Sequence, residues 1–212
     1  MEKRFVYADN AATTKPDPRV LEAMKPYLTE CWGNPSSIYS FGQDAKEALS
    51  EARAKIASLM GCDAGEIYFT SCGTESDNWA IRGAAYANIR KGKHLITTKV
   101  EHHAVLHTME ALKKEGFEVT YLDVDEYGMV SPESVRNAIR DDTTLVAVMY
   151  ANNEIGTVMP IAEIAKITKE KKVLFFTDAV QAIGHEKINL HELGADMLSC
   201  SGHKINAPKG TG

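Results

Sequence analysis

The stretch Met197-Leu198-Ser199-Cys200-Ser201-Gly202-His203-Lys204 places a short apolar run directly before a polar turn that ends in a lysine. A lysine just past a buried strand is partly desolvated, so it loses its proton readily and can form a Schiff base with an aldehyde. Ser201 and His203 are then placed to hold an anion beside it. The alternative is that Lys204 is a solvated surface charge, as most lysines are. Other residues must decide between the two interpretations.

The composition is that of an ordinary globular α/β protein. The 212 residues are 44% hydrophobic and 25% charged, which suits one large domain or two small ones. The net charge of −5 argues against a nucleic-acid surface, and no apolar run approaches the length of a membrane span. Residues 1–5 lack the apolar core of a signal peptide. No Cys-x-x-Cys pair occurs, so we expect reduced thiols in a cytoplasmic protein at Cys31, Cys62, Cys72 and Cys200.

Upstream of Lys204 the chain alternates between apolar runs and amphipathic segments. We expect strands near residues 67–70, 94–98, 118–122, 145–149, 173–177 and 196–200. We expect helices near residues 18–29, 43–60, 75–90, 103–115, 132–140 and 160–171. This alternation predicts an α/β three-layer sandwich, in which a mainly parallel sheet lies between two layers of helices.

Polar residues follow five of the expected strands. Ligands of such sheets bind beyond the carboxyl ends of the strands, so these residues should meet at one edge. They are Thr70–Ser76, Glu101–His103, Asn152–Glu154, Asp178 with Gln181, and Ser201–Lys204.

The small polar turn from Ser71 to Thr74 opens an expected helix. Free backbone N–H groups and the helix dipole favour a phosphate there. The commoner use of such residues is N-capping by Ser71 or Thr74, and that alternative stays open.

The histidines after the second expected strand allow several uses. His102 is placed to stack on a planar ring or to move protons, although a lone histidine in this position is more often structural. His103 and His107 are four residues apart, a spacing that can bind a metal. No third ligand has supporting spacing, so we expect no metal site.

Asp178 ends the apolar run that begins at Val173. A carboxylate at the end of a buried strand needs a cationic or hydrogen-bonded partner, and a protonated pyridine nitrogen would serve. A Schiff-base lysine combined with an aspartate at the pyridinium nitrogen is how enzymes hold pyridoxal phosphate. A structural aspartate that caps the next turn is the alternative.

The chain resembles the cysteine desulfurases, which are pyridoxal-phosphate enzymes of the aminotransferase class-V group with fold type I. The resemblance covers the whole chain in order. It rests on the motifs Asp9–Thr14, Gly33–Ser37, Thr70–Asn78, Glu101–His102 with Ala104–Leu106, Asn152–Gly156, Asp178–Gln181 and Ser201–Lys204.

The resemblance implies a role for each site residue. Lys204 carries the pyridoxal 5′-phosphate and shuttles protons, and Asp178 pairs with the pyridinium nitrogen. His102 stacks on the ring and acts in acid–base steps, so the implied catalytic residues are Lys204, His102 and Asp178. Gln181 hydrogen-bonds the phenolic oxygen of the ring, and Asn153 lies at the cofactor and substrate face. The phosphate is held by Gly73, Thr74, Ser201 and His203.

The same resemblance implies a reaction. L-cysteine binds to the cofactor, an enzyme cysteine attacks its sulfur, and L-alanine and an enzyme persulfide result. The sulfur passes to an iron–sulfur scaffold or another sulfur acceptor. The implied protein is a cytoplasmic, homodimeric sulfurtransferase with no nucleic-acid or membrane partner.

The chain departs from the family in length, because members run to nearly twice 212 residues. We expect residues 1–15 to pack near a small domain, residues 16–212 to be an incomplete cofactor-binding large domain, and the C-terminal small domain to be absent. None of the four cysteines matches the nucleophile, so we expect the isolated chain to be weakly stable and inactive. It is then a fragment, or another chain completes it. The alternatives are a selenocysteine lyase or another class-V enzyme, and a cofactor-free, non-catalytic scaffold that only binds a partner.

Overall fold

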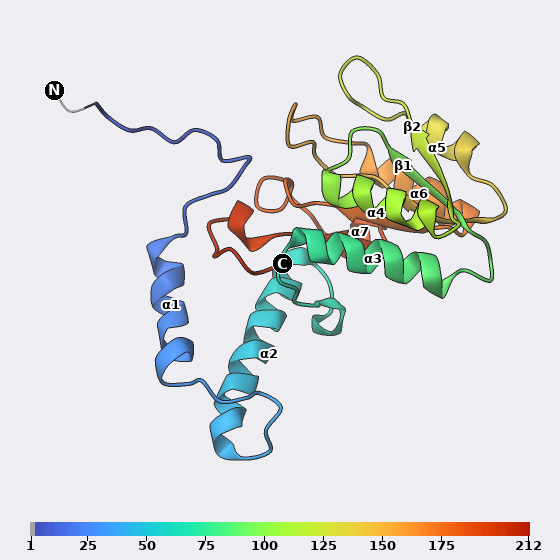
Figure 1. Ribbon diagram of the computed structural model, residues 1–212. Coiled ribbons are helices and arrows are strands. Elements are labelled where there is room, and N and C mark those ends of the chain that lie inside the picture. Colours follow the sequence, from blue (N-terminus) through green and yellow to red (C-terminus); the bar gives the residue numbers. More distant parts are fainter. Residues whose placement is uncertain (1–2) are drawn as a thin grey trace.

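A five-stranded, all-parallel sheet forms the centre of the structure, a computed structural model that describes residues 3–212 (Figure 1). The strand order is β2-β1-β3-β4-β5, and every neighbouring pair is parallel. The strands are β1 (His94–Thr98), β2 (Glu118–Leu122), β3 (Thr143–Ala147), β4 (Leu174–Asp178) and β5 (Met197–Ser199). The expected mainly parallel sheet is therefore confirmed.

Helices cover both faces of this sheet, because alternate side chains of each buried strand point to opposite sides. Phe176 of β4 packs in one apolar cluster with α3 (Gly73–Ala87) and α4 (His103–Lys114). Its neighbour Phe175 packs in a second cluster on the other face. That face is covered by α5 (Pro132–Ala138) and α6 (Ile161–Lys171). The three expected layers are confirmed (Figure 1).

Two further helices stand away from the sheet (Figure 1). No residue of α1 (Pro18–Thr29) is buried, and α2 (Ser40–Met60) buries only Gly42 and Ala57. Large apolar side chains of this region face solvent: Leu28 is 71% exposed, Ile38 96% and Leu59 83%. Among residues 3–212, no helix combines the length and the apolar character that crossing a membrane requires.

The predicted strand at residues 67–70 is wrong. Ile67–Thr70 is extended but belongs to no strand of the sheet. Its pairing is limited to Thr70, which exchanges two backbone hydrogen bonds of 2.8 and 2.9 Å with Gly212. An extended apolar segment becomes a strand only where a neighbour pairs along its length, and here the contact covers a single residue.

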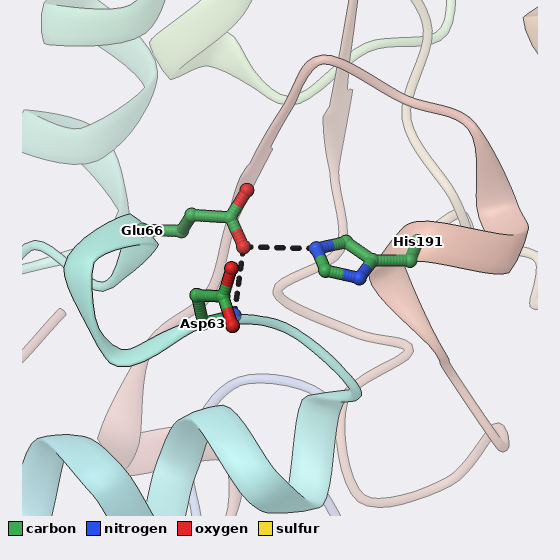
Figure 2. Close-up of side chains that lie close together, drawn as sticks. All are labelled: Asp63, Glu66 and His191. Atoms are coloured by element: carbon green, nitrogen blue, oxygen red, sulfur yellow. Dashed lines mark hydrogen bonds and ion pairs between the residues drawn. The ribbon is translucent and has the colours of Figure 1, made fainter.

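Short helices complete the chain: η1 (Ala64–Glu66), α7 (Leu190–Leu193) and η2 (Gly202–Lys204). An exposed cluster links the first two (Figure 2). Oε2 of Glu66 accepts the N–H of Asp63 at 2.8 Å and lies 3.0 Å from Nε2 of His191. The Asp63 N–H and the His191 ring lower the pKa of Glu66. We interpret this cluster as a set of surface polar contacts that holds η1 against α7.

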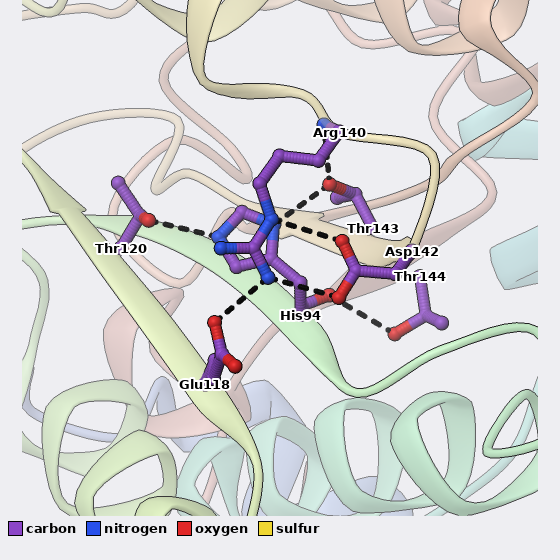
Figure 3. A network of polar contacts seen from close by, with 7 residues as sticks. All are labelled: His94, Glu118, Thr120, Arg140, Asp142, Thr143 and Thr144. Carbon is purple, nitrogen blue, oxygen red and sulfur yellow. Dashed lines mark hydrogen bonds and ion pairs between the residues drawn. The ribbon is translucent and has the colours of Figure 1, made fainter.

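A polar network closes the amino-terminal edge of the sheet (Figure 3). The buried ring of His94 lies 2.7 Å from Oγ1 of Thr143 and 2.8 Å from Oγ1 of Thr120, so it joins β1 to both neighbours. Burial lowers the pKa of His94. Above it, Arg140 contacts the carboxylates of Glu118 and Asp142 at 2.8 and 2.9 Å. The network fixes strand register at the end of the sheet opposite the predicted site.

Candidate active site

A cleft of about 440 Å³ opens at the carboxyl edge of the sheet. It lies where β1, β3, β4 and β5 end, as the fold class leads one to expect. A second hollow, of about 490 Å³, lies between α6, α7 and the amino end of β4 and contains none of the predicted residues. The structure brings all nine predicted site residues together in the first cleft: Gly73, Thr74, His102, Asn153, Asp178, Gln181, Ser201, His203 and Lys204.

The first turn of α3 forms one end of the cleft, and it lacks a side-chain cap. Cys72 is the N-cap residue and makes no capping hydrogen bond. Ser71 instead directs its N–H and its hydroxyl to the carboxylate of Glu75, at 2.6 and 2.7 Å. Thr74 lies inside the helix. The N-capping alternative for Ser71 and Thr74 is therefore wrong, and Gly73 and Thr74 of this uncapped turn line the cleft.

Two further observations fit a phosphate at this turn. Oγ of Ser201 is buried, and no hydrogen-bond partner is found for it within residues 3–212. A Cβ at Gly73 would lie 2.8 Å from Cγ2 of Val180 and 3.4 Å from Cβ of Ser201, so the backbone of this turn closely approaches the loops after β4 and β5. A helix N-terminus and an unpartnered hydroxyl together suit an anion with several oxygens.

Lys204 lies in η2, and its amine points into the cleft. Nζ donates hydrogen bonds to the carbonyl oxygens of Ala11 and of Ala12, the latter at 3.0 Å. Burial lowers the pKa of Lys204, although Asp9 and Asp178 act in the opposite direction. A partly desolvated amine with a lowered pKa is suited to attack an aldehyde carbon.

Residues 9–14, here called the N-terminal strap, lie against this lysine. The N–H and Oγ1 of Thr14 both donate to the carbonyl of His203, at 2.9 and 2.8 Å. Nδ1 of His203 is 3.0 Å from Oγ1 of Thr13. Gln181 donates its amide N–H to the carbonyl of Ala11 at 2.9 Å. The strap therefore forms one wall of the cleft.

Asp178 ends β4 at the floor of the cleft and is buried. Its Oδ1 accepts the N–H of Val180 at 2.9 Å, while Oδ2 makes no hydrogen bond with the described residues. Burial raises the pKa of Asp178, and the Val180 N–H, His102 and Lys204 oppose that shift. His102 is the N-cap of α4, where its Nδ1 accepts the N–H of Ala104 at 3.2 Å. A buried carboxylate with one free oxygen fits a protonated ring nitrogen.

The sequence interpretation assigned no role to two buried carboxyl groups beside this floor. Glu101 accepts hydrogen bonds from Oγ1 of Thr98 at 2.7 Å and from the N–H of Met149 at 2.9 Å, and burial raises its pKa to about 8. Asp77 on α3 lines the cleft itself. A signal for Asp77 was present, because it lies four residues before Ile81, on the apolar stripe of its helix.

The other candidates lie outside this arrangement. The rings of His103 and His107 are 5.3 Å apart on α4, both exposed, and no third ligand joins them in the part of the chain that the structure describes. Cys72 lines the cleft, whereas Cys31, Cys62 and Cys200 do not.

A parallel sheet whose carboxyl edge brings together a lysine, a buried aspartate and an uncapped helix N-terminus defines a pyridoxal-phosphate-binding domain. Comparison with known families agrees with this class. The chain belongs to the aminotransferase class-V family, whose model matches residues 6–212. Enzymes of this family depend on pyridoxal 5′-phosphate.

Individual relatives are similar along the whole chain. It is 60% identical over 211 residues to a cysteine desulfurase IscS of Methanosarcina thermophila, which covers all of this chain and 52% of the relative. It is 56% identical over 207 residues to a cysteine desulfurase IscS of Clostridium botulinum, covering 98% of this chain and 52% of that protein. The chain thus spans about half the length of the curated relatives it matches.

Solved structures share the fold closely. A NifS-like protein superimposes with a TM-score of 0.95 at 43% identity, covering 97% of this chain and 57% of its own. A structure described as SspA in complex with cysteine gives a TM-score of 0.94 at 40% identity, covering 97% of this chain and 59% of its own. The chain thus matches a little over half of each of these solved chains.

Proposed function

We propose that this chain carries the cofactor-binding part of a cysteine desulfurase, which takes sulfur from L-cysteine, passes it to an enzyme cysteine as a persulfide and releases L-alanine. One observation carries the proposal. Lys204, Asp178 and the uncapped start of α3 meet in a single cleft of a chain that is 60% identical to a protein named cysteine desulfurase IscS. The cleft residues supply the groups that such a reaction requires.

In this proposal each cleft residue has a separate role in binding the cofactor or in moving protons. The amine of Lys204 would hold the cofactor covalently and, once released by the substrate, move a proton at the substrate's α-carbon. When bound, pyridoxal phosphate supplies an electron sink for the charge that develops at that carbon. Asp178 would hold the ring nitrogen protonated, and His102 would lie against the ring and exchange protons. Gln181 would meet the phenolic oxygen, and Asn153 would face the cofactor and the substrate.

The uncapped start of α3 and the buried hydroxyl of Ser201, described above, support a binding site for the cofactor's phosphate at this end of the cleft. The N–H groups of Gly73 and Thr74, the hydroxyl of Ser201 and the ring of His203 would bind the phosphate oxygens. Burial lowers the pKa of His203, so at neutral pH this ring would bind through a neutral N–H rather than as a cation.

The thiol that receives the sulfur is, in this proposal, none of the four cysteines. Cys72 is fixed at the N-cap of α3, a rigid position for a group that must carry sulfur away. Burial raises the pKa of Cys200 and of Cys62, which leaves them less thiolate.

The whole protein would be a cytoplasmic homodimer that passes sulfur to an iron–sulfur scaffold or another acceptor. Residues 16–212 would form most of its large domain, and residues 1–15 would pack near a small domain. The exposed apolar side chains of α1 and α2 support a covering partner, either the second subunit or that small domain. A structural neighbour described in complex with cysteine supports L-cysteine as the substrate.

The decisive experiment is to incubate the purified protein with pyridoxal phosphate and L-cysteine and to measure L-alanine. We expect alanine to form with the complete protein, to be absent in Lys204→Ala, and to persist in Lys209→Ala, which removes an exposed lysine of the same loop. A yellow, loaded protein that turns over L-selenocysteine alone would favour the lyase alternative. A protein that stays colourless with cofactor would leave the non-catalytic scaffold as the better account.

A further inference from the structure

Asp77 is a buried carboxyl group that the proposed chemistry leaves without a role. It is 1% exposed, and its Oδ1 lies 2.5 Å from Oγ of Ser199. One oxygen of Asp77, one oxygen of Asp178 and one ring nitrogen of His102 lie within 4.8 Å of one another. Ser199 and Asp178 are register partners on β5 and β4, so both side chains leave the sheet toward α3. Two carboxyl groups therefore share one buried space under the cleft.

Two carboxylates at this separation in a buried site cannot both ionise at low cost, so the pair holds one proton at neutral pH. The surroundings decide which group holds it. Asp178 receives the Val180 N–H and faces the positive charge of Lys204 and the ring of His102. Within residues 3–212, the carboxyl group of Asp77 has one hydrogen-bond partner, the hydroxyl of Ser199. Burial, followed by the charge of Asp178, raises the pKa of Asp77 to about 8.

We propose that Asp77 is a positioning residue: it carries the proton of the Asp77–Asp178 pair, holds Ser199 beside Asp178, and leaves Asp178 as the single anion under the ring nitrogen of the bound cofactor. A proton on Asp178 instead would remove the acceptor that the ring nitrogen needs. The inference rests on the proposed function only through that last contact. The location of the proton is a property of this chain and can be measured without cofactor.

The titratable groups around the pair come from four segments. Asp178 ends β4, Glu101 and His102 lie between β1 and α4, Cys200 follows β5, and Lys204 lies in η2. Glu101 serves as the matched control, because it is also buried and also has a pKa raised to about 8.

The first test compares the unfolding of wild type, Asp77→Asn and Asp178→Asn in denaturant from pH 5 to 8. Between the ordinary pKa of aspartate, 3.8, and about 8, the folded wild type holds a proton that the unfolded chain releases, so wild-type stability falls as pH rises. Asn at position 77 removes that proton. The folding constant of Asp77→Asn relative to wild type should grow by up to tenfold per pH unit.

Asp178→Asn should show no such trend, because Asp77 stays buried and keeps its proton. The opposite result would overturn the proposal by placing the proton on Asp178. In that result the folding constant relative to wild type changes with pH in Asp178→Asn and stays constant in Asp77→Asn. If the folding constant relative to wild type is independent of pH in both variants, neither carboxyl group holds a proton between pH 5 and 8. That result would also overturn the proposal.

The second test uses the protein loaded with pyridoxal phosphate and follows the absorption of the bound cofactor with pH. Ionisation of Asp77 adds a negative charge next to Asp178, so wild type and Glu101→Gln should share a spectral change near pH 8 that Asp77→Asn lacks. A purely structural Asp77 would leave that pH profile unchanged in all three proteins. If no cofactor spectrum forms, the proposed function fails, and the unfolding test still decides where the proton lies.

Should Asp77→Asn fail to fold, the infrared carbonyl band of protonated carboxyl groups in the Glu101→Gln protein replaces it. A band that persists at pH 7 and disappears as pH rises through about 8 supports a shared proton in the pair. A band already absent at pH 7 refutes it.

Discussion

Replacing Asp178 with asparagine keeps the volume of the side chain and changes its chemistry toward the cleft. Oδ1 of the asparagine can still accept the N–H of Val180, a contact of 2.9 Å in the structure. The second side-chain position, which is the free oxygen Oδ2 in Asp178, becomes an amide N–H donor in the asparagine. A ring nitrogen that is protonated beside Asp178 loses both its acceptor and its counter-charge.

The expected magnitude follows from the contact that is lost. A hydrogen bond to a charged group contributes about 1.5–3 kcal/mol, and Asp178 is buried, so we expect the upper half of this range. Since about 1.4 kcal/mol is a factor of ten, the Kd for pyridoxal phosphate should rise by about 40- to 140-fold. Proton exchange at the substrate's α-carbon should slow by at least as much, because the ring can no longer accept electron density as a pyridinium.

The assay is absorbance titration of the apo protein with pyridoxal phosphate, together with NMR of deuterium exchange at the α-carbon of L-alanine. Alanine has no sulfur to transfer, so the exchange needs no nucleophilic cysteine. Asp196→Asn is the control, because Asp196 also accepts a single backbone N–H, that of Phe175 at 2.7 Å, at the other end of the sheet. It should change neither measurement. Cofactor affinity and exchange within threefold of wild type in Asp178→Asn would show that Asp178 is only structural.

Three further outcomes are expected. Borohydride reduction of the loaded protein followed by peptide mapping should place the pyridoxyl group on Lys204, and a label on Lys209 would refute the assignment. Ser201→Ala should stabilise the apo protein by about 1 kcal/mol, because it removes a buried hydroxyl that has no partner among residues 3–212. The same change should raise the Kd for pyridoxal phosphate about tenfold, and a lower apo stability measured by urea unfolding would contradict this interpretation. Glu101→Gln should remove a loss of stability of up to about 1.4 kcal/mol per pH unit between pH 4.5 and 8, because burial raises the folded pKa above the unfolded value; equal pH profiles of urea midpoints for variant and wild type would refute it.

The central strands could be predicted from local sequence because each is a short apolar run bounded by polar turns. Strands at 94–98 and 118–122 match β1 and β2 at both ends. The segment 67–70 has the same apolar character, but whether a strand forms depends on a partner far away in the chain. Thr70 pairs with Gly212, and no local pattern reports a contact of that separation.

The convergence of the site followed from topology, because parallel strands present their carboxyl ends at one edge. What could not be predicted was which groups lie beneath that edge. The helical spacing of Asp77 and Ile81 indicates that Asp77 lies on the buried face of α3, but it does not indicate which group Asp77 meets there, and Ser199 has no distinguishing pattern in its strand. Their 2.5 Å contact depends on how α3 lies across β5, which is a property of packing.

The N-terminal strap also dictates when the cleft can exist during synthesis. The carbonyls of Ala11 and Ala12 contact Lys204, and Thr14 contacts His203, across sequence separations of 189 to 193 residues. Ribosomes add about 5–20 residues per second, so the strap emerges about 10–40 s before the segment that completes the wall. Throughout that interval the N-terminal strap of a nascent chain lacks its contacts with Lys204 and His203. If Lys204 holds the cofactor as proposed, covalent loading can follow only after η2 has left the ribosome.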